Sequence, residues 1–88
     1  MNPIEYFGDL LSKKIGKGDL VGRGLLLYSV QDEVGSTDVI NLDVLKRTFQ
    51  NSLKIRLGKV NVPDVDKISD EMVKELLQKQ SLLTIGAV

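Results

Sequence analysis

The chain has 88 residues, and its 12 Lys and Arg balance its 12 Asp and Glu, so the formal net charge is zero. Hydrophobic residues make up 42% of the sequence, and Cys, His and Trp are absent. This composition excludes a disulfide scaffold, a metal site built on Cys or His, and catalysis by either residue. It also argues against a disordered chain, so we expect one globular domain over residues 1–88.

No basic and then apolar segment precedes a small-residue cleavage site, so we expect no signal peptide. The longest unbroken apolar run, residues 25–28, is far shorter than the roughly 20 residues that cross a bilayer. We therefore expect a cytoplasmic protein without membrane contacts. The zero net charge provides no general attraction to nucleic acid or to an anionic membrane.

The first predicted helix runs from Pro3 to about Lys14. Asn2 is a suitable N-cap, Pro3 suits the first helical position, and Gly16 is a natural left-handed stop. Apolar residues recur at spacings of three and four, which indicates one buried stripe: Ile4, Phe7, Leu10, Leu11 and Ile15.

A glycine-rich stretch, residues 16–24, leads into the second predicted helix. Asp19 could cap a helix that ends at Val34 with Gly35 as the stop, but internal glycines favour a start nearer Leu25. Residues 25–30 would also fit a buried strand. The stretch contains cations and could cradle an anion. We favour a connector in which Gly22 or Gly24 lets two helices pack closely.

The third predicted helix extends from Leu42 to about Leu57, with Asn41 as N-cap and Gly58 as stop. Its leucines and Phe49 keep a nearly regular spacing of four. Apolar and basic residues alternate after residue 52, however, so residues 53–62 would also fit a hairpin.

The fourth predicted helix follows Ser69 as N-cap, and residues 82–88 form an apolar tail without charge. Asp64 to Glu75 has the length of a calcium loop, but Ser69 replaces the glycine that such a loop needs at its sixth position. We therefore expect neither a metal nor a cofactor.

These elements predict an all-α fold, a small bundle of about four short helices with an apolar C-terminal tail. The alternative is α+β with a short hairpin near residues 53–62. The predicted core comprises Phe7, Leu10, Leu11, Leu26, Leu27, Val30, Leu45, Phe49, Leu53, Met72, Val73, Leu76 and Leu77.

The favoured function is a non-enzymatic protein-interaction or assembly module. Four consecutive apolar residues on a helix cover most of its sides, so one core cannot bury them all, and the tail adds further apolar surface. We therefore expect a homo-oligomer. The candidate interface residues are Leu25, Leu27, Tyr28, Leu82, Leu83 and Ile85.

The alternative function is a small helix-turn-helix DNA-binding regulator that reads with the third helix. Arg47, Asn51 and Lys54 follow each other at spacings of four and three, so a continuous helix would present them on one basic face. The zero net charge makes nucleic acid the less favoured partner.

Overall fold

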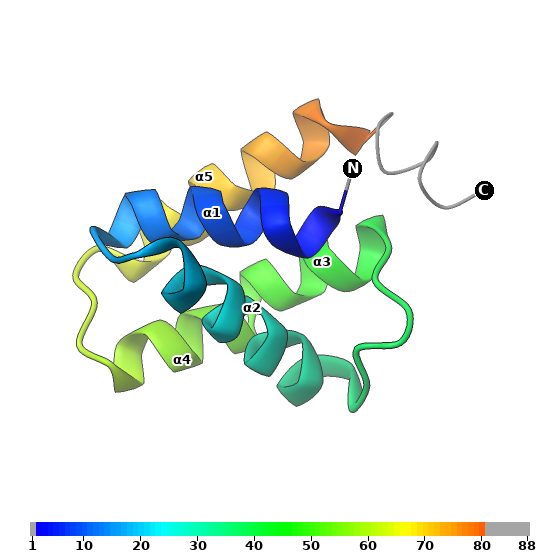
Figure 1. Ribbon diagram of the computed structural model, residues 1–88, viewed down its shortest axis with the longest axis horizontal. Coiled ribbons are helices and arrows are strands. Elements are labelled where there is room, and N and C mark those ends of the chain that lie inside the picture. Colours follow the sequence, from blue (N-terminus) through cyan, green and yellow to red (C-terminus); the bar gives the residue numbers. More distant parts are fainter. Residues whose placement is uncertain (1, 81–88) are drawn as a thin grey trace.

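The computed structural model describes residues 2–80, which form five α-helices and no strand (Figure 1). The helices are α1 (Pro3–Ile15), α2 (Asp19–Val34), α3 (Leu42–Gln50), α4 (Ser52–Lys59) and α5 (Val65–Gln78). The all-α prediction is confirmed. Both strand alternatives are wrong, because residues 25–30 lie within α2 and residues 52–59 form α4.

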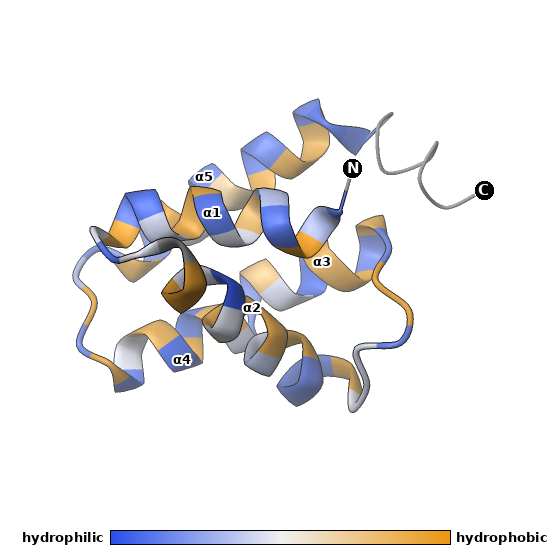
Figure 2. Cartoon of the chain, in the orientation of Figure 1, coloured by the Kyte–Doolittle hydropathy of each residue, from blue (hydrophilic) through white to orange (hydrophobic). Residues whose placement is uncertain are grey.

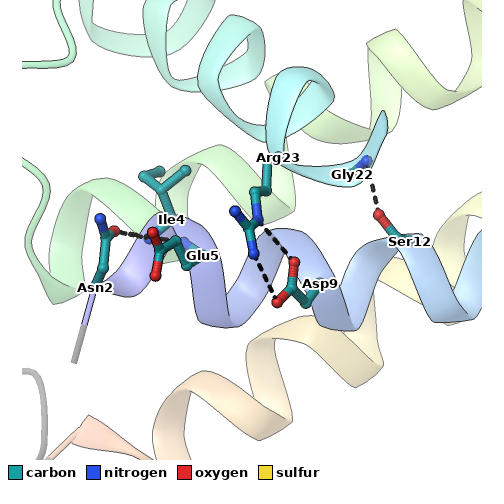
Figure 3. A network of polar contacts seen from close by, with 7 residues as sticks. All are labelled: Asn2, Ile4, Glu5, Asp9, Ser12, Gly22 and Arg23. Atoms are coloured by element: carbon teal, nitrogen blue, oxygen red, sulfur yellow. Dashed lines mark hydrogen bonds and ion pairs between the residues drawn. The ribbon is translucent and has the colours of Figure 1, made fainter. Parts of the chain in front are cut away.

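Local signals in the sequence set several helix ends correctly. Asn2 accepts hydrogen bonds from two amides in the first turn of α1 (Figure 3), and Asn41 does the same for one amide of α3. Gly16 and Gly35 end α1 and α2 with φ of 70° and 76°, a left-handed conformation that strains other side chains.

The predicted third helix is in fact two helices, α3 and α4, which separate at Asn51 (φ −126°, ψ −84°). Long-range hydrogen bonds satisfy the backbone groups on either side of the break. The Ser69 hydroxyl donates to the Phe49 carbonyl at 2.6 Å, and the Glu33 carboxylate accepts from the Ser52 amide and hydroxyl at 3.3 and 2.9 Å. Glu33 also places negative charge at the start of α4, where the helix dipole favours it.

Three predicted helix boundaries are wrong. Ser69 is not a cap, because α5 already begins at Val65 and Ser69 is buried against α3. Gly58 does not stop its helix, since α4 continues to Lys59. The favoured start of the second helix near Leu25 is wrong, since α2 begins at Asp19 after Gly18 as N-cap, one residue from the alternative in which Asp19 is the cap.

The five helices pack around one cluster of buried apolar side chains. Leu27 and Leu77, which we expected in this core, are instead 39% and 44% exposed. The cluster consists of Ile4, Phe7, Leu11, Leu26, Val30, Val44, Leu45, Phe49, Leu53, Leu57, Ile68, Met72 and Leu76, with Leu10 and Val73 packed at its edge.

The closest helix contact is the crossing of α1 and α2, where two glycines meet. A Cβ on Gly22 would overlap the carbonyl oxygen of Gly8, and a Cβ on Gly8 would lie 2.7 Å from the Cα of Arg23. Gly22 also donates its amide proton to the buried Ser12 hydroxyl at 2.8 Å (Figure 3). The expected close packing at Gly22 is therefore present, and only glycine fits there.

We predict opposite effects for two alanine substitutions in α2. Gly22→Ala should lower the free energy of unfolding by about 3 kcal/mol or more, because backbone on both helices must move to admit the methyl group. In a dilute, monomeric sample Gly24→Ala should raise it by about 0.5–1 kcal/mol, because no atom beyond its own turns of helix lies within 4 Å of the added Cβ and alanine favours helix.

Urea unfolding followed by circular dichroism measures both changes. Equal effects of the two substitutions would contradict the close crossing at Gly22.

Candidate protein-interaction surface

Helix α2 is apolar on two opposite sides. One side, which includes Leu26 and Val30, is fully buried in the core. On the other side Leu20, Leu27 and Tyr28 are 78%, 39% and 61% exposed. Figure 2 shows the hydrophobic colour recurring along α2.

We call the exposed side the α2 outer face and define it as Leu20, Val21, Gly24, Leu27 and Tyr28. These residues follow each other at helical spacings of three, four and seven, so they share one side of the helix. Gly24 lies at the centre of the face with open space beside it. The face is therefore an apolar strip with a shallow middle, which suits the close approach of another helix.

Only some of the predicted interface residues lie on the α2 outer face. Leu27 and Tyr28 lie on the outer face, whereas Leu25 is partly buried and packs against the core. Leu82, Leu83 and Ile85 lie outside the described residues.

Sequence reasoning missed Leu20 and Val21, which extend the face by two turns. The available signal was their spacing, since they precede Leu27 and Tyr28 by seven residues each. Val21 is 45% exposed. Both residues sit among glycines, which moved the predicted start of the helix to Leu25.

A polar cluster borders the outer face on the side of α4. The Arg56 guanidinium lies 5.0 Å from the centre of the Tyr28 ring and forms two hydrogen bonds to Asp32, at 2.6 and 3.1 Å. These bonds hold the pKa of the Asp32 carboxyl below its ordinary value. Arg56 thus links α4 to α2 and positions the Tyr28 ring. Its neighbour Ile55 is 60% exposed.

The residues of the DNA-binding alternative do not share one helix. Arg47 lies in the last turn of α3, Asn51 at the break, and Lys54 in the first turn of α4. Arg47 pairs with Asp43 at 3.3 Å, and Lys54 pairs with Asp66 at 3.2 Å. The continuous recognition helix on which this alternative depended is therefore absent, and no observation favours it over the α2 outer face.

The anion cradle considered for residues 16–24 gains no support either. Arg23 reaches across to Asp9 on α1, with hydrogen bonds of 2.8 and 3.1 Å (Figure 3). Gly22 packs directly against α1 at the helix crossing and is not accessible to an anion. This geometry fits a connector that brings α1 and α2 into contact.

A hollow of about 280 Å³ lies between the end of α1 and the start of α5, and the Lys14–Glu71 ion pair (2.6 Å) lines it. Within residues 2–80 no buried side-chain nitrogen or oxygen lacks a hydrogen-bond partner, and no three acidic side chains gather as metal ligands.

No protein-family model, curated protein or solved structure matches the chain. None of the helices in the described part is long and apolar enough to cross a membrane.

We predict that stability falls in acid. Three carboxyl groups accept hydrogen bonds from a cation on another helix, and each has a lowered pKa: Asp9 with Arg23, Asp32 with Arg56, and Glu71 with Lys14. Because the folded pKa lies below the unfolded one, these pairs stabilise the fold above about pH 5, and this stabilisation is lost progressively as the pH falls toward about 2.

Urea midpoints at neutral and acid pH measure this loss. In the Asp32→Asn variant the urea midpoint should change less between neutral and acid pH than it does in the native chain. An unchanged difference would mean that the Arg56–Asp32 pair contributes nothing to stability.

Proposed function

We propose that the chain is a non-enzymatic protein-assembly module that self-associates through the α2 outer face. One observation carries this proposal, namely the exposure of Leu20, Leu27 and Tyr28 on a helix whose opposite side is already buried in the core. The exposed apolar side of such a helix is stabilised only when a second surface covers it and removes it from water.

The alternative to association is to leave the strip in water, where monomers rarely keep contiguous apolar patches beyond a few hundred Å². Burial of such a strip contributes about 25 cal/mol per Å² before the costs of association. Arg56 of α4 lies over the Tyr28 ring and borders the outer face there.

The size of the face also bounds the strength of the assembly. Stable interfaces usually bury about 800 Å² and roughly 20 residues on each partner, and the outer face has only five residues. The contact must therefore include neighbouring residues. We expect an affinity in the micromolar range, at the weak end for specific complexes.

The apolar tail is the second surface in this proposal. Leu82, Leu83 and Ile85 belong to a seven-residue stretch, 82–88, without any charge. A chain that ends at Gln80 keeps every described helix and separates the contribution of the tail from that of α2.

We predict that the full chain is an oligomer at about 100 µM and that Leu20→Glu shifts it to the monomer, because a carboxylate would have to lose its water in the interface. Glutamate in the first turn of α2 suits the helix dipole, so the fold should keep its stability. Light scattering after size exclusion gives the mass, and circular dichroism gives the fold.

Val39→Glu is the matched control, because Val39 is 65% exposed but lies in the loop between α2 and α3. This variant should remain an oligomer. A monomeric full chain at the same concentration would refute the proposal. An oligomer that survives Leu20→Glu but not truncation at Gln80 would move the interface to the tail.

A further inference from the structure

We infer that the partner of the α2 outer face is the same face of a second copy, with the two α2 helices antiparallel and crossing at Gly24. This inference rests on the proposed function, and it adds the identity, direction and register of the contact.

The outer face is self-complementary about Gly24. In an antiparallel pair centred there, residues at equal distances before and after Gly24 lie opposite each other, so Leu20 meets Tyr28 of the second copy and Val21 meets its Leu27. Each large side chain thus faces an apolar one, and glycine meets glycine at the centre. Small residues at a crossing allow the shortest distance between helix axes. Such a pairing is closed by twofold symmetry and uses one patch on both subunits.

The two ends of α2 lie in regions of opposite charge. Residues 10–19, up to the first residue of α2, contain three lysines and one acid, Asp19, whereas residues 31–43, which end the helix, contain four acids and no base. An antiparallel pair brings the basic end of each copy to the acidic end of the other. A parallel pair would place like charges together, which opposes association.

Ion pairs inside the chain do not cancel this asymmetry. Among these charges Lys14, Asp32 and Asp43 form ion pairs within the chain. The exposed Lys13 and Lys17 stand at the basic end, and the exposed Asp38 stands at the acidic end together with Glu33. In the antiparallel register Lys17 of one copy lies near residues 31–32 of the other.

The helix dipole favours the same direction. The last turn of α2 contains no basic residue, although the carbonyl end of a helix is stabilised by positive charge. The antiparallel partner brings its helix N-terminus and Lys17 to that end. The contact therefore supplies positive charge where α2 itself has none.

Disulfide trapping tests the direction directly, because the native chain has no Cys. A tagged full-length Leu20→Cys chain is mixed with an untagged Tyr28→Cys chain at about 100 µM and mildly oxidised. Opposite residues of an antiparallel pair lie close enough to bond. Two copies of position 20 are eight residues apart along the helices, about 12 Å, beyond the roughly 7 Å that a disulfide allows between Cα atoms.

We expect the mixed disulfide to form several-fold faster than either homodisulfide. Val60→Cys, mixed with either chain, is the control for random collision, because Val60 is 54% exposed at the end of α4 and lies outside residues 10–43; its disulfides should not exceed that background. Predominance of the Leu20→Cys homodisulfide, or a dimeric mass without any disulfide above background, would overturn the antiparallel register and leave self-association intact. A monomeric mass for the native chain would overturn both proposals.

Discussion

The structure depends above all on the glycine contact between α1 and α2. Gly22 lies so close to the Gly8 carbonyl that no other residue fits, and its amide is bound by the Ser12 hydroxyl from the opposite helix. Arg23 then fixes the rotation of α2 through its two bonds to Asp9. The crossing determines which side of α2 enters the core, and by the same step it turns the opposite, equally apolar side outward.

The helix ends that sequence analysis predicted well are those whose signals are local. Asn2 and Asn41 cap the helices that follow them, and Gly16 and Gly35 end theirs in the left-handed region. Each signal lies within a few residues of the end that it sets. The all-α class could be predicted for the same reason, because spacing within single segments was enough.

The break between α3 and α4 could not be predicted, because its causes come from other parts of the chain. Local sequence favours one long helix, but Ser69 binds the Phe49 carbonyl and Glu33 binds the start of α4. Only part of the α2 outer face could be predicted, because the start of α2 also depends on a contact with another helix. Leu27 and Tyr28 could be named from a crowded apolar run. Leu20 could not be named from the sequence, because the glycines around it are unfavourable in a helix and placed the predicted start of the helix later. The structure shows that Gly22 is required where α2 crosses α1.

The most direct test of this account is a dilution series of the isotope-labelled native chain, followed by backbone amide NMR shifts. If the outer face of α2 binds a second copy, dilution should change the NMR shifts of the Leu20, Gly24 and Tyr28 amides. The amide shifts of Gly8 and Gly22, which lie in the crossing of α1 and α2, should remain constant. Spectra that do not change with concentration would contradict the account. So would shifts confined to α5 or to the break between α3 and α4.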